Sequence, residues 1–152
     1  MKRKFDLKKL LLIIGIVLLA IQSIRIDKTT KPLNTTTDFI TSTMANETIS
    51  HTLKIACYDC HSNQATYPWY SHIAPISWWI KNHINEGSLH LNFSDWATYS
   101  EKKRNHKLEE CIELVEEGEM PMYSYTVMHK EAKLTDAQKL ELVEYFKSMK
   151  NQ

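Results

Sequence analysis

Two cysteines three positions apart, followed at once by a histidine, constrain this chain more than any other feature. They stand in the run Cys57-Tyr58-Asp59-Cys60-His61, and the 152 residues contain only three cysteines in all. This spacing is the attachment pattern of haem c. On one helical turn both sulfur atoms point to one side, where they can bond the two vinyl groups of a porphyrin, and the adjacent histidine can reach the iron. The sequence therefore predicts one covalent haem, held by Cys57 and Cys60, with His61 as an iron ligand.

Other uses of a cysteine pair fit this sequence less well. A thioredoxin-like redox pair would sit on a βαβ unit, and no such pattern is visible. A zinc site needs a fourth ligand, which only Cys111 or a scattered histidine would supply. A plain disulfide is compatible with an exported protein. Haem attachment accounts best for the pattern.

The iron of a haem electron carrier usually binds a sixth ligand. Met120 is the predicted one, because it follows Gly118 and precedes Pro121 and so lies on a stiff segment where a side chain can be aimed. Met122 stands two residues on, and alternate side chains of an extended segment share a face. The other candidates are Met128, His90, His106, His129 and, as the first histidines to test, His72 and His83.

The second ring nitrogen of His61 needs a hydrogen-bond acceptor to fix the ring. A carbonyl in the loop 67–75 is the expected source, with Pro68 as the first choice. Aromatic residues are dense in this part of the chain, and some of them should line a haem pocket, because aromatic rings bury a large area. They are Tyr67, Trp69, Tyr70, Trp78, Trp79, Phe93, Trp96 and Tyr99.

Hydrophobic periodicity predicts helices and no strand. The first helix covers residues 47–57 and leads directly into the cysteine pair. The second covers residues 77–86, with Ser77 as its N-cap and Gly87 as its end. Few glycines and prolines are present, which also argues against a turn-rich β fold.

Two further helices complete the expected domain. One covers residues 105–117 and ends at Gly118. The other begins at Thr135, where Gln138 can return the capping hydrogen bond. Its broad apolar face comprises Leu140, Leu142, Val143, Tyr145, Phe146 and Met149. The predicted fold is all-α, a cytochrome c-like helical domain around one covalent haem.

The N-terminus has the layout of an export signal, a basic start followed by an apolar run. Residues 1–26 carry a net charge of +5 and residues 27–152 one of −4. As a helix, the run 10–24 would extend ~22 Å, less than the ~30 Å of a bilayer core, but flanking lysines can lengthen the span. No A-x-A cleavage pattern follows Ala20. We therefore favour a retained transmembrane signal-anchor over a cleaved signal peptide.

The sequence thus divides into a signal-anchor or signal peptide at 1–26, a polar linker at 27–45 and a haem-binding domain at 46–150. The positive-inside rule places the domain on the periplasmic, extracytoplasmic side of a cell membrane. The basic residues cluster beside the apolar run, so no nucleic-acid-binding face is expected.

Taken together, these motifs resemble the bacterial haem-binding domain proteins, small single-haem relatives of cytochrome c. The resemblance covers about residues 50–148. It implies a c-type haem, an exported domain and an N-terminal anchor, with thioethers at Cys57 and Cys60, His61 as proximal ligand and Met120 as distal ligand. Cys111 lies outside the pattern, as does Met122. The motifs that carry it are Cys57-Tyr58-Asp59-Cys60-His61-Ser62-Asn63, Tyr67-Pro68-Trp69-Tyr70, Ala74-Pro75, Ser77-Trp78-Trp79, Asn92-Phe93-Ser94, Trp96, Gly118-Glu119-Met120-Pro121 and Tyr125.

The expected function is electron transfer by Fe(II)/Fe(III) cycling, without a small-molecule substrate and without enzymatic turnover. The partners would be the membrane and redox proteins. The alternative is a haem peroxidase or a gas or redox sensor, which needs an open or easily displaced sixth position. A haem-dependent structural subunit of a larger complex is a third possibility. Cys111 is expected to be a reduced core thiol, because it shares an apolar stripe with Leu108 and Val115.

Overall fold

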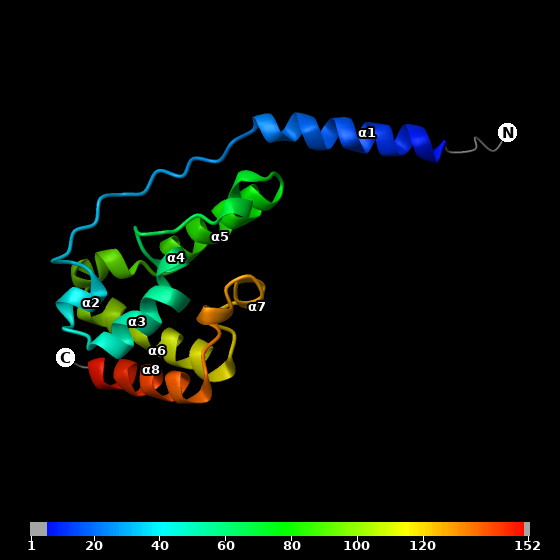
Figure 1. The fold of residues 1–152 in the computed structure, drawn as a ribbon. Coiled ribbons are helices and arrows are strands. Elements are labelled where there is room, and N and C mark those ends of the chain that lie inside the picture. Colours follow the sequence, from blue (N-terminus) through cyan, green and yellow to red (C-terminus); the bar gives the residue numbers. More distant parts are fainter. Residues whose placement is uncertain (1–5, 151–152) are drawn as a thin grey trace. The chain divides into compact units, whose positions relative to one another are not determined.

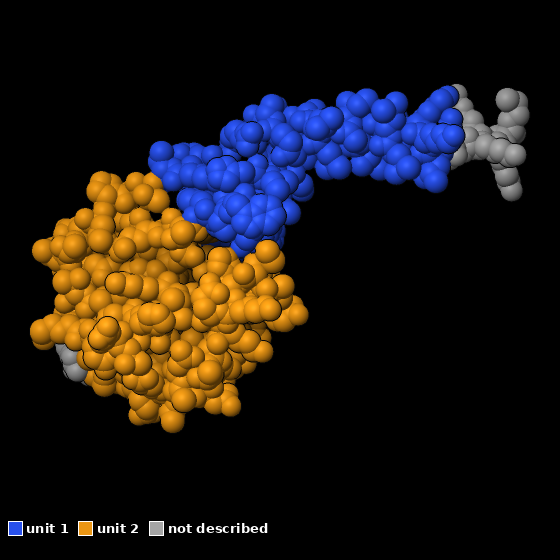
Figure 2. Space-filling model, in the orientation of Figure 1, with its two compact units in different colours: residues 1–29, 67–83 blue, residues 30–66, 84–152 orange. Residues whose placement is uncertain are grey.

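The computed structural model describes residues 6–150, and that part of the chain is helical without any strand. The all-α prediction is therefore confirmed. The chain forms two compact units, shown in different colours in Figure 2. Unit 1 comprises residues 1–29 and 67–83, and unit 2 comprises residues 30–66 and 84–152.

In the described residues, five helices of ten or more residues are joined by shorter ones (Figure 1). The α-helices are α1 (Leu7–Ala20), α2 (Phe39–Ser42), α3 (Glu47–Ala56), α4 (Tyr58–His61), α5 (Ile76–His90), α6 (Glu101–Glu117), α7 (Tyr123–Thr126) and α8 (Asp136–Met149). The 3-10 helices are η1 (Ile21–Ser23), η2 (Trp69–His72), η3 (Phe93–Thr98) and η4 (Lys130–Ala132).

The core of unit 2 is built around the ring of Phe39. This ring is fully buried and lies 4.8 Å from the ring of Trp96, 5.1 Å from that of Phe93 and 6.1 Å from that of Phe146. Phe39 falls within the stretch 27–45 that the sequence suggested as a linker. The folded unit therefore begins before α3 and includes Phe39. Burial of so large an apolar ring lowers the free energy of the folded state.

α3 and α8 begin as the sequence predicted. Asn46 caps α3 by accepting a hydrogen bond from the backbone N–H of Ile49, and Thr135 and Gln138 form the predicted capping box of α8. The buried side of α8 is narrower than predicted. Leu142, Val143 and Phe146 are buried, whereas Leu140 is 64% exposed, because a single helix face cannot bring it to the core as well.

α6 begins one turn earlier than predicted, at Glu101. Ser100 caps it through a hydrogen bond from the backbone N–H of Lys103 to its Oγ. The first turn of α6 is wholly charged and lacks the apolar spacing on which the prediction relied. Its C-terminus is where the sequence placed it, because Gly118 adopts the left-handed conformation with φ of 78°.

α5 differs most from the sequence prediction. It runs from Ile76 to His90, so Gly87 lies inside the helix and does not end it. Ser77 belongs to the first turn of α5 and is buried, and so it does not precede the helix as an N-cap would. Gly87 is instead required by a close contact with Cys60, which is far away in the sequence.

Unit 1 contains α1, the apolar run at the start of the chain. Its leucines, isoleucines and valine are largely solvent-exposed, and none of its residues is buried. Among residues 6–150, no helix is both long and apolar enough to cross a membrane. The transmembrane anchor predicted for this segment therefore stays a prediction.

Candidate functional site

The cysteine–histidine motif forms a single turn at the junction of α3 and α4. The backbone of Cys57 leaves the helical conformation with φ of −128°, and its carbonyl then accepts hydrogen bonds from the N–H groups of Cys60 at 3.2 Å and His61 at 2.9 Å. α3 is anchored below it by Leu53, whose side chain is fully buried. The two sulfurs and the imidazole are thus held on one short, internally bonded turn.

The ring of His61 is fixed by two backbone carbonyls of unit 2. Its Nδ1 lies 3.0 Å from the carbonyl oxygen of Gly87 and 3.2 Å from that of Leu91. Because carbonyls can only accept, Nδ1 carries the proton and Nε2 keeps its lone pair. Burial lowers the pKa of His61, which favours the neutral imidazole that can bind a metal ion.

The predicted acceptor for His61 was wrong. The carbonyl of Pro68 accepts hydrogen bonds from the backbone N–H of Ser71 at 3.0 Å and from its hydroxyl at 2.6 Å. The acceptors for His61 come instead from the last turn of α5 and the residue after it. The carbonyl of Gly87 also accepts from the backbone N–H of Leu91 at 2.9 Å, and its second lone pair remains available to the imidazole.

Gly87 explains why α5 can lie so close to the motif. A Cβ atom built on Gly87 would stand 2.8 Å from the carbonyl oxygen of Cys60 and 3.2 Å from its Cβ. Any side chain here would push the two segments apart and draw the carbonyl of Gly87 away from His61. A glycine inside a helical pattern often marks such a close approach, and this is the signal that the sequence interpretation missed.

The two residues between the cysteines hold the turn from two sides. The hydroxyl of Tyr58 donates to the buried carboxylate of Asp38 at 3.2 Å, and its ring stacks on that of Phe93 at 5.4 Å. The carboxylate of Asp59 accepts hydrogen bonds from the backbone N–H of Thr66 at 3.0 Å and from the hydroxyl of Tyr125 at 2.7 Å. Both partners of Asp59 lie outside the turn, so they restrain its orientation.

The thiols of the motif do not resemble an activated redox pair. Burial raises the pKa of Cys57 to about 12 and that of Cys60 to about 11, so both are protonated at neutral pH. Catalytic cysteines of thioredoxin-like proteins have lowered pKa values instead. No disulfide is formed by the cysteines that the structure describes, and residues 6–150 contain no group of three or more His, Cys, Asp or Glu side chains placed to hold a metal ion.

Met120 lies on the segment that joins α6 to α7. Its backbone N–H donates to the carbonyl of Leu114 at 3.0 Å, and the peptide bond to Pro121 is cis. The side chains of Met120 and Met122 are both half-buried, whereas Met128 is 55% exposed. Met120 and Met122 are therefore the less exposed of these three methionines.

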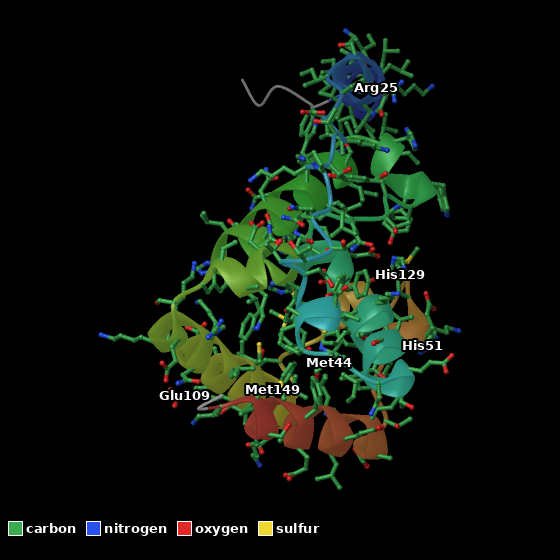
Figure 3. The ribbon with its side chains drawn as sticks, turned by 90° about the vertical axis from the view of Figure 1, so that its left-hand side faces the viewer. Arg25, Met44, His51, Glu109, His129 and Met149 are labelled. Carbon is green, nitrogen blue, oxygen red and sulfur yellow. The ribbon has the colours of Figure 1, made fainter. Side chains whose placement is uncertain are left out.

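α7 ties this segment back to the motif. Tyr125 of α7 donates its hydroxyl to Asp59, and its ring stacks on that of His129 at 4.3 Å with an angle of 14° between the planes. His129, which is labelled in Figure 3, follows α7 in the chain, and its Nδ1 lies 3.4 Å from the carboxylate of Glu131. The segment that carries Met120 and Met122 is thus bonded at its far end to the residue beside Cys60.

The two histidines proposed as alternative ligands belong to unit 1, and the motif belongs to unit 2. The Nε2 of His72 lies 3.0 Å from the ammonium group of Lys28. The Nδ1 of His83 lies 2.8 Å from the carbonyl oxygen of Trp79, and the two rings are 4.1 Å apart. Each imidazole thus already has a polar neighbour within its own unit.

Cys111 packs against the core of unit 2 with Cys57 and Ile112. Its pKa is raised, mainly by burial and further by the nearby Cys57 thiol. The environment matches that of the predicted core thiol.

The aromatic residues singled out from the sequence separate into two groups, since Phe93 and Trp96 are buried and Trp69 is 71% exposed. The Phe93 ring lies 6.4 Å from that of His61, which makes Phe93 the aromatic neighbour of the motif.

Comparison of the sequence with protein-family models shows that residues 16–148 match the haem-binding domain family. The chain belongs to the haem-binding domain family. Its match extends from α1 to the last turn of α8 and so includes every residue of the site described above. No curated protein and no solved structure matches this chain.

The residues present fit the cofactor that this family binds. The turn supplies an imidazole with a free Nε2 and a fixed Nδ1–H, which is the state in which histidine ligates metals. Two thiols stand on the same turn, and Phe93 offers an apolar ring beside the imidazole. The protein is therefore a haem-binding domain, and the thiols of Cys57 and Cys60 and the imidazole of His61 lie together in its unit 2.

Proposed function

We propose that this haem-binding domain is a monohaem c-type cytochrome that carries electrons. The observation that carries the proposal is the turn Cys57–His61, in which His61 is held by the carbonyls of Gly87 and Leu91. Two thiols three residues apart serve a purpose in haem binding only when both bond the porphyrin. Bound haem would supply reversible Fe(II)/Fe(III) chemistry, and the protein would hold and tune it.

The proposed role of each residue of the turn follows from its contacts in unit 2. Cys57 and Cys60 form the two thioethers, and His61 binds the iron through Nε2. The two carbonyls that accept from Nδ1–H make the imidazole a stronger donor and stop the ring from turning. Tyr58 and Asp59, through Asp38 and Tyr125, keep the whole turn in one orientation.

Met120 is proposed as the distal ligand, with Met122 as the competing residue. Both are half-buried, and both precede α7, which Tyr125 bonds to Asp59. A thioether on the iron favours Fe(II) over Fe(III) and raises the potential relative to a second histidine. It would also fill the sixth position, so that neither a substrate nor a gas binds there. The protein is accordingly proposed to be an electron carrier and not an enzyme.

The N-terminal segment is proposed to be a retained signal-anchor that holds the haem domain on the extracytoplasmic side of the cell membrane. Support comes from α1, whose apolar side chains are exposed all around, and from the five basic residues within positions 1–9. The 14 residues of α1 rise ~21 Å, so lysines at its start would have to snorkel. A tether of this kind raises the local concentration of the haem domain near membrane-bound redox partners.

A redox titration combined with ligand binding tests the proposed function. The purified holoprotein should be reduced and reoxidised reversibly with one electron per haem. Ferric protein at neutral pH should bind added cyanide slowly, and ferrous protein should bind CO slowly, because the sixth position is taken. Rapid binding of either ligand by the wild type would favour a peroxidase or sensor and would contradict the electron-carrier assignment.

A further inference from the structure

In the segment 69–79 of unit 1, the usual placement of small and large side chains is reversed. The small residues Ser71, Ala74 and Ser77 are buried, with exposed fractions of 4% or less. The large apolar residues are outside, with Trp69 exposed to 71%, Trp79 to 47%, Ile76 to 46% and Ile73 to 41%. A contiguous segment that turns two tryptophans and two isoleucines outward is typical of a contact surface.

This segment is fastened to the chain that leaves α1. The side-chain amide of Gln22 accepts from the backbone N–H of Ala74 and donates to its carbonyl, both at 3.0 Å. The indole N–H of Trp78 donates to the carbonyl of Ile24 at 3.1 Å. Gln22 and Ile24 follow shortly after α1 in the chain. Their hydrogen bonds therefore hold the segment 69–79 beside the C-terminal end of α1.

Two basic side chains that follow α1 also bind the segment 69–79. The guanidinium of Arg25, which is labelled next to α1 in Figure 3, donates to the carbonyl of His72 at 3.1 Å. The ammonium group of Lys28 donates to the hydroxyl of Ser71 at 2.7 Å. Arg25, Lys28 and His72 line one hollow of unit 1. Positive charge, exposed tryptophan and a neighbouring apolar helix thus occur together within unit 1.

We propose that Trp69, Ile73, Ile76 and Trp79 form a surface that rests in the headgroup region of an anionic lipid bilayer. Tryptophan is enriched at that depth, because its ring is apolar while its N–H remains hydrated. Arg25 and Lys28 would lie among the lipid phosphates. The inference rests on the proposed anchor, since α1 inserted in lipid brings the fastened segment to the interface.

A lipid surface fits better than a protein partner. Beyond Lys8 and Lys9, the apolar side chains of α1 are exposed on all its faces, which suits an apolar phase that surrounds the helix better than a partner that covers one side. The part of unit 1 beyond α1, residues 21–29 and 67–83, carries three Lys or Arg and one Asp in sequence, a net charge of +2, which complements anionic headgroups. Two copies of this unit would repel each other for the same reason.

The test uses the full-length holoprotein in phosphatidylglycerol vesicles made with ordinary or brominated lipid. Bromine quenches tryptophan emission on contact, and the ratio of the two signals cancels quenching by the haem. Wild type should lose emission in brominated vesicles. Trp69→Phe combined with Trp79→Phe should remove at least half of that loss, whereas Trp96→Phe, in the buried core of unit 2, should remove none.

Each outcome bears on the proposal. An unchanged loss in the double variant would overturn it, because the quenched rings would then be others. A loss equally large in phosphatidylcholine vesicles would overturn the role of lipid charge. Flotation of the same samples tests the anchor separately: wild type that floats without quenching contradicts the surface alone, and wild type that stays in solution contradicts the anchor as well. Emission that shifts with protein concentration without vesicles would assign the surface to a second copy.

Discussion

Units 1 and 2 place their large apolar residues in opposite ways. In unit 2, Phe39, Leu53 and Phe146 are almost wholly buried, and the net charge in sequence is −5. In unit 1, Trp69 and the leucines of α1 are exposed, and the net charge is +6. The same residue types therefore fold one unit and leave the other with apolar surface. We infer that unit 2 carries the redox chemistry and unit 1 the contact with the membrane.

The largest contrast between the units should come from their histidines. His61→Ala removes the imidazole that the site presents to iron, so the holoprotein should lose its low-spin absorption spectrum or fail to accumulate. His72→Ala in unit 1 should leave the spectrum unchanged. Absorption spectra of both variants at equal protein concentration check this. A changed spectrum in His72→Ala would mean that unit 1 contributes an iron ligand and would contradict the assignment of the redox chemistry to unit 2 alone.

Glycines offer a second matched pair. Gly87→Ala places a Cβ 2.8 Å from a backbone oxygen of Cys60, so we expect a loss of about 1–3 kcal/mol in the free energy of unfolding. Gly15→Ala in α1 meets nothing within 4 Å and should leave the stability of the haem domain unchanged. Thermal unfolding followed at the haem band measures both. Equal melting temperatures for Gly87→Ala and wild type would show that α5 need not approach Cys60 so closely.

The methionines of unit 2 provide a finer distinction. Met120→Ala should abolish the iron–sulfur charge-transfer band of the ferric protein, open the iron to cyanide and lower the potential. Met122→Ala should change none of these, although its side chain is half-buried on the same segment. Near-infrared absorption and potentiometry separate the two. Loss of the band in Met122→Ala alone would identify Met122 as the ligand.

The smallest effect is expected at Cys111. Its thiol packs against the core beside Cys57. We propose that Cys57 and Cys60 alone attach the haem. Cys111→Ala should lower the free energy of unfolding by about 1 kcal/mol through the lost packing, with no change in the visible spectrum. Denaturant titration measures the free energy of unfolding, and a visible absorption spectrum shows whether the haem environment has changed. A shifted haem band would show that Cys111 touches the cofactor.

Local signals in the sequence predicted local structure well. The capping box at Thr135 and Gln138 and the left-handed Gly118 are both present. The resemblance to the haem-binding domain family, which rests on short motifs, is confirmed by the family match. Each of these features depends on residues within a few positions of one another, which is the range over which sequence patterns are most informative.

Three of the errors involve contacts between distant parts of the chain. Gly87 has the sequence signature of a helix end, but 27 positions separate it from Cys60, whose close approach explains the glycine. For the same reason Pro68 was the wrong acceptor for His61, because one of the true acceptors, Leu91, lies 30 positions away. Phe39 was assigned to a linker, since nothing near it in the sequence indicates the core that it joins.

Covalent attachment of haem to Cys57 and Cys60 underlies the other proposals, and the intact mass of the denatured polypeptide tests it directly. Wild-type protein, unfolded in acid and stripped of unbound cofactor, should exceed its sequence mass by one haem. Cys57→Ala combined with Cys60→Ala should show the bare polypeptide mass, and Cys111→Ala should keep the added haem. A wild-type chain at its bare mass, or a double variant that still carries haem, would contradict the proposal that Cys57 and Cys60 attach the cofactor.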